Sequence, residues 1–219
     1  MIVFIVSLRG MSRIVLLRHA HSSANAKGIL SGRNEGVALS KEGYKQAEKL
    51  VSRLEGASFS AIRVSPMQRC IETIDPWLSI QSARTRQKSL IEPSLIEVDF
   101  GIWTGKKLSH LQTKKEWKIV QNSPQSMKFP GGESLKQLQK RAMKTVEAMA
   151  EISGGQPRLI VTHADVIKAI LSSVLSSGLK DFQKFSINPA SISIIEFHKG
   201  LARIITVNNS HGTLKELLG

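Results

Sequence analysis

The chain has 219 residues, 41% hydrophobic and 22% charged, and its 31 lysines and arginines against 17 acids give a formal net charge of +14. This composition is ordinary for a globular protein and excludes a disordered or fibrous chain. The single cysteine, Cys70, excludes a disulfide within the chain, so we expect a reducing, cytoplasmic environment, with Cys70 packed against a sheet.

Residues 1–10 form an apolar N-terminal extension ahead of the single domain that we expect over residues 11–219. The apolar stretch Met1–Ser7 has no basic residues before it and is too short to span a bilayer. An added edge strand, a loose tail and an upstream start codon all fit this stretch, and a membrane anchor fits it least. We therefore expect no membrane partner.

Ile14–Leu17 is a short, unbroken apolar run, which is typical of a strand buried on both faces of a parallel sheet. The run stops at Arg18 and His19, and open α/β sheets bind ligands at the carboxyl ends of their strands. Small polar residues follow, namely Ser22, Ser23 and Asn25, and they suit a loop that hydrogen-bonds an oxyanion. Taken alone, this stretch fits equally well a strand whose Arg and His end in solvent.

Two later apolar runs favour the ligand-binding interpretation. Ala61–Ser65 is followed by Arg69 near the start of a helix, and Leu159–Thr162 ends in His163. If these strands run parallel to the first, two arginines and two histidines meet at one edge of one sheet.

Helical patterns connect these strands. Ser40 and Ser134 are expected N-caps, Asp165 is a candidate N-cap for the apolar helix after it, and Gly56 is expected to close the Ser40 helix. Pro76 is expected to end or kink the helix that contains it. Two apolar stripes predict the buried faces of the Ser40 and Ser134 helices, and they consist of Tyr44, Ala47, Val51 and Leu54, and of Leu135, Leu138, Ala142, Val146 and Met149.

The remaining segments complete the predicted fold. Residues 26–39 are expected to form a loop over the site, and residues 81–92 a loop and a short strand. Lys106–Lys118 holds five lysines, and we favour a solvated helix over a cap that faces the substrate. Ser191–His198 and Ala202–Val207 are expected to pair antiparallel through a turn that contains Gly200. The pattern predicts a three-layer α/β/α fold with a mostly parallel central sheet and one antiparallel edge strand.

Five segments also match, in order, the motifs of one known family. They are Leu16–Ala20 with Ser22 and Asn25, Ser65–Arg69 with Glu72 and Thr73, Leu95–Gly101 with Trp103 and Gly105, Pro130–Ser134, and Val161–His163. Jointly they resemble the histidine phosphatase superfamily, which includes the cofactor-dependent phosphoglycerate mutases. Ala20 stands where the family usually has Gly, and His21 where it often has an acid or an amide.

The resemblance implies a phosphatase that works through a phosphohistidine and needs neither a metal nor a cofactor. It implies that His19 is the nucleophile and that Glu97 protonates the departing alkoxide. It also implies that His163, Arg18 and Arg69 hold the phosphoryl group. Substrate contacts are expected from Asn25, Ser31 and Gly32.

Residue chemistry supports part of this assignment. Arg18 and Arg69 suit bidentate contacts to phosphoryl oxygens, and their charges lower the pKa of a neighbouring imidazole. A neutral imidazole is what a nucleophile requires, but residue types do not decide which histidine attacks. Glu97 has apolar neighbours that can raise its pKa, although an ordinary surface carboxylate would otherwise be the preferred interpretation. Asp165 is a rival acid.

Two alternatives stay open. The first is a mutase that returns the phosphoryl group to another hydroxyl, and the second is a non-catalytic basic protein that uses the fold for binding. We expect a small phosphorylated substrate and no nucleic acid, because aromatic residues make up only 5% of the chain and no nucleic-acid motif is present. His and acidic residues show no metal-ligand spacing, and either a monomer or a homodimer fits.

Overall fold

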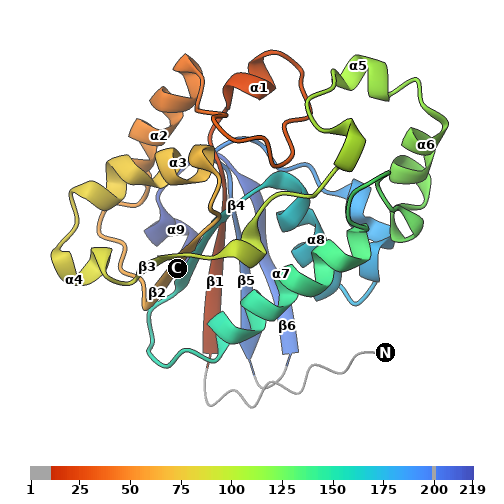
Figure 1. Ribbon diagram of the computed structural model, residues 1–219. Helices are drawn as coiled ribbons and strands as arrows, with labels where there is room; N and C mark the ends of the chain where they lie inside the picture. Colours follow the sequence, from red (N-terminus) through yellow and green to blue (C-terminus); the bar gives the residue numbers. More distant parts are fainter. Residues whose placement is uncertain (1–10, 199–200) are drawn as a thin grey trace.

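The computed structural model describes residues 11–198 and 201–219. Six strands form one sheet in the order β3-β2-β4-β1-β5-β6 (Figure 1). Their bounds are Met11–Arg18 for β1, Ala61–Val64 for β2, Ser89–Ile91 for β3, Arg158–Thr162 for β4, Ile192–His198 for β5 and Leu201–Asn209 for β6. The proposed strand or tail at residues 1–10 and the turn at 199–200 lie outside the described residues.

The sheet is mixed but mostly parallel, as predicted. β1 pairs with β4, β4 with β2 and β2 with β3, all in parallel register. β5 is antiparallel to both β1 and β6. The strand that runs against the others is therefore β5, which lies one position inside the edge formed by β6.

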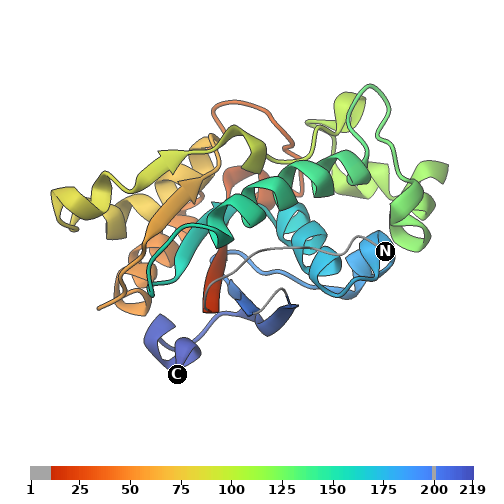
Figure 2. The ribbon, with the colours of Figure 1, turned by 90° about the horizontal axis from the view of Figure 1, so that it is seen from below.

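Helices cover both faces of the sheet, as the three-layer prediction requires (Figures 1 and 2). One layer contains α2 (Lys41–Arg53), α3 (Gln68–Ser79) and α9 (Leu214–Leu218), and the other contains α7 (Leu135–Ala150) and α8 (Ala164–Val174). The shorter helices are α1 (Ser23–Ala26), α4 (Ala83–Arg86), α5 (Leu108–Leu111) and α6 (Lys115–Asn122), with 3₁₀ turns at Pro93–Leu95, Gly101–Trp103, Pro124–Ser126 and Gly178–Lys184.

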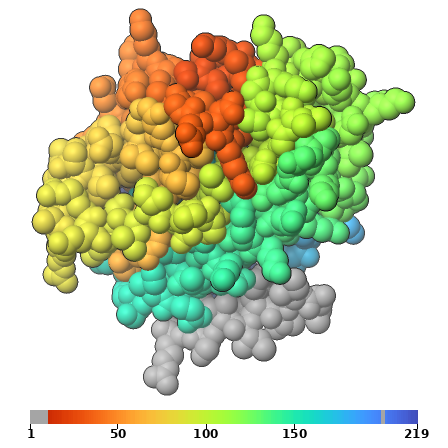
Figure 3. All heavy atoms as spheres, in the orientation of Figure 1, coloured from red at the N-terminus to blue at the C-terminus, as the bar shows by residue number. Residues whose placement is uncertain are grey.

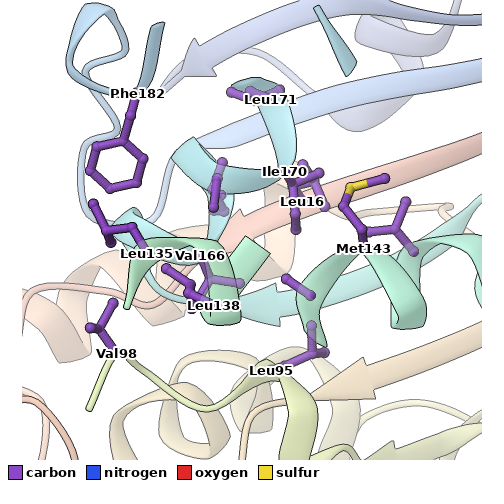
Figure 4. Packing of buried hydrophobic residues seen from close by; sticks show 14 of the residues in the cluster. Leu16, Leu95, Val98, Leu135, Leu138, Met143, Val166, Ile170, Leu171 and Phe182 are labelled. Carbon is purple, nitrogen blue, oxygen red and sulfur yellow. The ribbon is translucent and has the colours of Figure 1, made fainter. Parts of the chain in front are cut away.

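β1 shows why its sequence reads as a continuous apolar run. Ile14 and Leu16 face the layer of α7 and α8, whereas Val15 and Leu17 face the layer of α2 and α3, and all four are fully buried. Figure 4 shows one side of this arrangement, with Leu16 among side chains of α7 and α8. A strand that is covered on both faces is apolar at every position, so its sequence shows no alternation of apolar and polar residues.

The predicted buried stripe of α2 is wrong at Tyr44, whereas Ala47 and Leu54 are buried as predicted. Tyr44 is 45% exposed, and the buried residues are Gly43, Ala47 and Leu50. A Cβ atom on Gly43 would lie 1.9 Å from the backbone oxygen of His21, so this glycine lets the helix approach the chain that follows β1. The buried face of α2 therefore contains Gly43, and Tyr44 lies on the exposed side. It also ends at Arg53, three residues before Gly56.

Pro76 does not end its helix, because α3 continues to Ser79. The proline removes one backbone hydrogen bond, but Trp77 beyond it is buried and its Nε1 donates to the Leu54 oxygen at 3.2 Å. Tertiary packing therefore holds the last turn of α3.

Candidate active site

Three parallel strands deliver the predicted residues to one edge of the sheet. Arg18 is the last residue of β1 and pairs in register with Thr162 of β4, so His19 and His163 follow neighbouring strand ends. Their ring centroids lie 5.2 Å apart. Arg69 reaches the same place from the first turn of α3, which follows β2.

His19 is buried, with 4% of its surface exposed. Its Nδ1 lies 2.7 Å from the backbone oxygen of Ala20. A carbonyl oxygen only accepts hydrogen bonds, so Nδ1 carries the proton and Nε2 keeps a free lone pair. Burial, reinforced by the charges of Arg18 and Arg69, holds the pKa of His19 well below its usual value, so the ring is neutral.

His163 is fully buried, and both of its nitrogens have partners. Arg69 Nη2 lies 3.2 Å from Nδ1 and must be the donor there, which leaves the proton on Nε2 to be donated to Ser65 Oγ at 2.8 Å. Burial and the charge of Arg69 hold the pKa of His163 well below its usual value. The Cys70 sulfur lies 3.6 Å from Nε2, and burial raises the pKa of this thiol to about 12, so Cys70 packs there as a neutral group.

Arg18 and Arg69 carry buried N–H groups that the described part of the chain leaves without acceptors. Arg69 is fully buried, and its Nη2 donates to the Gly32 oxygen at 2.9 Å, but its Nε and Nη1 have no partner. Arg18 Nη1 donates to the Ile187 oxygen at 2.6 Å, and its Nε has no partner. A buried charged donor without an acceptor is costly, so these groups form a site that an oxyanion would satisfy.

Glu97 lies beside the histidines, with Oε2 3.6 Å from His163 Nδ1 and Oε1 accepting from the Val98 amide at 2.9 Å. Burial, together with the charge of Asp165, raises the pKa of Glu97 to about 7. Asp165 is not the N-cap of α8, because that position belongs to His163 and no side chain caps the helix. Asp165 instead lies in the first turn of α8 and lines the same cavity as Glu97. Its negative charge contributes to the raised pKa of Glu97.

Sequence reasoning missed the group that fixes the backbone of Glu97. Arg33 Nε and Arg141 Nη2 both donate to the Glu97 backbone oxygen, at 2.9 and 3.0 Å. Glu133 Oε1 accepts from both arginines, at 3.0 and 2.6 Å, and also from the Asp99 amide at 3.0 Å. We call Arg33, Glu133 and Arg141 the Glu133 clamp. In the sequence, the only indication of a role for Glu133 is its place in the matched segment Pro130–Ser134.

A cavity of about 280 Å³ opens beside these groups. Arg18, His19 and Glu97 line it, and so do the three residues from which substrate contacts were expected, Asn25, Ser31 and Gly32. His21 is not among its lining residues, since its Nδ1 lies 2.8 Å from Ser40 Oγ at the start of α2. The departure from the family motif at His21 therefore lies away from the cavity.

The roof of the cavity consists of two segments that pair with each other. The Leu30 amide donates to the Lys106 oxygen and the Leu108 amide to the Gly28 oxygen, at 2.9 and 2.8 Å. Figure 3 shows this contact from outside, where the orange-red loop meets the green segment. We call residues 105–122, which contain α5 and α6, the cap segment.

The prediction of one solvated helix over Lys106–Lys118 is wrong. The segment contains two short helices, and Leu108 and Trp117 line the cavity, whereas four of the five lysines are exposed and Lys114 is half-buried. The lysines point to water because their charge is solvated there, which leaves the apolar side chains to face inward. The segment is thus a cap over the cavity.

Residues 11–198 and 201–219 contain no group of three or more His, Cys, Asp or Glu side chains placed to hold a metal ion. None of their helices has the length and apolar character needed to cross a membrane. His211, which lies near the C-terminus, is exposed.

Comparison with known proteins agrees with this geometry. Phosphoserine phosphatase 1 of Hydrogenobacter thermophilus is 27% identical over 201 residues, which cover 90% of this chain and 92% of that protein. A 2,3-bisphosphoglycerate-dependent phosphoglycerate mutase of Thermoplasma acidophilum is 29% identical, with coverage of 90% and 92%. The crystal structure of the α-ribazole phosphatase of Shigella flexneri matches the fold with a TM-score of 0.79, at 24% identity and coverage of 92% and 98%. The model of the histidine phosphatase superfamily (branch 1) matches residues 14–210, and this chain therefore belongs to that superfamily.

Proposed function

We propose that this protein hydrolyses small phosphate monoesters through a phosphohistidine formed on His19. One observation carries the proposal: His19, whose Nε2 is unprotonated, lines the cavity with Arg18, and buried N–H groups of Arg18 and of nearby Arg69 lack acceptors. A phosphate monoester supplies what this pocket lacks, because its oxygens accept from both arginines and offset their charge.

In the first step, His19 Nε2 attacks the phosphorus atom and the bond to the ester oxygen breaks. The positive charges of Arg18 and Arg69 stabilise the charge on the equatorial oxygens, and His163 holds Arg69 in place, because its Nδ1 accepts from Arg69 Nη2. The departing alkoxide takes the proton of Glu97, whose raised pKa keeps part of it protonated near neutral pH. Asn25 of α1, and Ser31 and Gly32 of the loop after it, contact the substrate.

In the second step, Glu97 is ionised and takes a proton from a water molecule. The hydroxide attacks phosphorus, the bond to His19 Nε2 breaks, and inorganic phosphate leaves. Glu97 regains its proton in this step, which makes it ready for the next ester.

A mutase would differ only in the acceptor, which would be a second hydroxyl rather than water. Only 35 positions separate Glu97 from Gly132, and in this chain the cap segment occupies that stretch. This short cap leaves the cavity beside it open, so we expect water to reach the phosphohistidine. With 3-phosphoglycerate, we expect free phosphate to appear faster than 2-phosphoglycerate and without added bisphosphoglycerate. Faster isomerisation that depends on bisphosphoglycerate would replace the hydrolase with a mutase.

The direct test is the phosphoenzyme. A substrate labelled in its phosphoryl group should leave label on the wild-type protein after an alkaline quench, which preserves phosphohistidine, and mass spectrometry should place it on His19. His19→Ala should lose both label and turnover. His163 cannot replace His19, because its Nε2 is hydrogen-bonded to Ser65 Oγ. His211→Ala changes an exposed histidine and should behave as wild type. Normal turnover by His19→Ala would refute the mechanism.

A further inference from the structure

The cavity extends from the phosphoryl site into a chamber with aromatic walls. Of the chain's seven phenylalanines and three tryptophans, three and two respectively line this one cavity. They are Phe100, Phe129, Phe182, Trp103 and Trp117. The rings come from separate parts of the chain, since Trp117 belongs to α6 and Phe182 to the 3₁₀ turn after α8.

Four of these rings, all except Phe182, form a continuous packed wall. Trp103 stacks on Trp117 with 6.1 Å between centroids and packs edge-on against Phe129 at 5.5 Å. Phe129 in turn meets Phe100 edge-on at 4.8 Å. Trp103 is buried, but Trp117 is only half-buried, so it carries surface that a ligand can still cover. Aromatic walls of this kind bind flat apolar groups by area and by edge-to-face contact.

Charge in the chamber disfavours a second anionic group on the ligand. Among the described residues that line the cavity, the cations are Arg18 and Lys168. Arg18 serves the phosphoryl site. Lys168 is occupied, with its Nζ 3.2 Å from Gln183 Oε1, 4.0 Å from Asp165 Oδ1 and 5.1 Å from the centroid of the Phe182 ring. Asp165 adds a carboxylate to the chamber, and a ligand carboxylate would be repelled by it.

We infer that the substrate is a phosphate monoester of an uncharged aromatic alcohol, whose ring packs against the wall formed by Trp103 and Trp117. This inference rests on the proposed function and names its substrate class. The volume agrees, because a cavity of about 150 Å³ already holds benzene, and this one measures about 280 Å³. A phosphoryl group with one or two rings therefore fits, whereas phosphoserine or 3-phosphoglycerate would bring a carboxylate to Asp165 and to Lys168, which among the described lining residues is the one cation beside Arg18 and already contacts Gln183.

The test compares phosphate release from benzyl phosphate, glycerol 3-phosphate, phosphoserine and 3-phosphoglycerate. All four are alcohol esters, so bond breaking is similar and binding decides the order. We expect kcat/KM for benzyl phosphate to exceed that for glycerol 3-phosphate by at least about tenfold, as burial of a ring implies. The two carboxylated esters should fall below glycerol 3-phosphate. A carboxylated ester that is preferred, or no preference at all, would overturn the inference while the proposed function stands.

Variants of the cap segment locate the effect. Trp117→Ala should reduce the benzyl-to-glycerol ratio of kcat/KM to about one-fifth or less, and Trp117→Phe should keep most of it. Ile119→Ala is the matched control on α6, because Ile119 is exposed and does not line the cavity. An unchanged ratio in Trp117→Ala would remove Trp117 from the site. If no ester releases phosphate, the proposed function fails instead, which keeps the two failures distinct.

Discussion

The guanidinium groups of Arg18 and Arg69 are held in place by the backbone before any ligand arrives. Ile187 and Gly32 supply the oxygens that fix them, and Arg18 Nε and Arg69 Nε and Nη1 stay buried without an acceptor in the described part of the chain. Donors oriented in advance need no reorganisation during the reaction, which is why they stabilise a transition state strongly.

We predict that Arg18→Ala and Arg69→Ala each lower kcat by about two orders of magnitude or more, which is the usual cost of removing one preorganised donor. Lysine at either position should restore charge but recover only part of the rate, because it lacks the planar fork. Arg63→Ala is the control, since Arg63 on β2 donates only to backbone oxygens away from the site. Steady-state kinetics measure this, and an alanine variant with near-normal kcat would exclude that arginine from the site.

Glu97 predicts a pH dependence of known sign. Its pKa is raised to about 7, so the acid form that protonates an alkoxide is lost as pH rises above that value. For alkyl phosphates, kcat should therefore fall above about pH 7, and Glu97→Gln should remove most of the rate. With p-nitrophenyl phosphate, whose phenolate leaves without a proton, the variant should lose far less. Equal losses on both esters would argue against Glu97 as the acid.

The same pKa has a consequence for stability. Unfolded glutamate titrates near 4.5, so between that value and about 7 the folded protein binds more protons than the unfolded chain. The free energy of unfolding therefore falls as pH rises through this window, and the fall is complete above it. Glu97→Gln lacks this titration, so its Tm relative to wild type should be higher at pH 8 than at pH 5. A difference in Tm that does not change with pH would contradict the raised pKa.

Residue types alone did not decide which histidine attacks. Two contacts support His19 as the proposed nucleophile: the Ala20 oxygen on His19 Nδ1 and the Ser65 hydroxyl on His163 Nε2. The first contact is local in sequence, but its geometry depends on the turn after β1. The second joins residues 98 positions apart, so only the folded chain reveals it.

At the scale of elements, the Glu133 clamp joins the segment after Gly132 to the acid segment at Glu97. Close backbone packing supports it, since a Cβ on Gly132 would lie 2.1 Å from the Asp99 oxygen. One carboxylate thus holds two guanidinium groups that in turn hold the Glu97 backbone. The negative charge of Glu133 offsets the charges of the two guanidinium groups, which a neutral amide would not do.

We predict that Glu133→Gln lowers the free energy of unfolding by about 1–3 kcal/mol, because it leaves partly buried donors poorly satisfied. The variant should also slow alkyl phosphates more than p-nitrophenyl phosphate. Loss of the clamp displaces Glu97, and only the alkyl leaving group needs the proton of Glu97. Urea unfolding and the ratio of the two kcat values measure these effects. Glu48→Gln on the exposed side of α2 is the control. A loss of stability without a change in the kcat ratio would make the clamp purely structural.

The elements that were predicted well are those fixed by local patterns. The buried strands follow from their apolar runs, and Ser40 and Ser134 cap their helices because a hydroxyl there satisfies backbone amides. The errors arose where tertiary contacts decide. Gly43 packs closely against the His21 backbone, which leaves Tyr44 exposed, and Trp117 lines the cavity under the cap segment. No local pattern contains either contact.

At the scale of the whole molecule, the net charge of +14 acts on the approach of the substrate. A phosphate ester is anionic, and a cationic protein raises its local concentration over a range set by salt. That range is about 30 Å at 10 mM ionic strength and about 8 Å at 150 mM. Charge spread over the surface therefore contributes to capture rather than to the chemical step.

We predict that kcat/KM for a dianionic ester falls several-fold when KCl is raised from about 10 to 150 mM, while kcat changes little, because screening weakens capture. Stopped-flow or steady-state assays at fixed pH measure both. Circular dichroism at each salt concentration confirms that the fold is unchanged. Salt-independent kcat/KM would show that long-range attraction does not limit association.

The sheet order has a consequence for how the chain is made. β4 lies between β1 and β2, so β1 cannot join the strand that follows it in sequence. Leu17 waits for Val161, which is 144 positions later, and synthesis at about 5–20 residues per second makes that wait roughly 7–30 s. During this interval an apolar strand leaves the ribosome without its parallel partner. We expect the nascent chain to need shielding until β4 emerges, and the two histidines to meet only in the final third of translation.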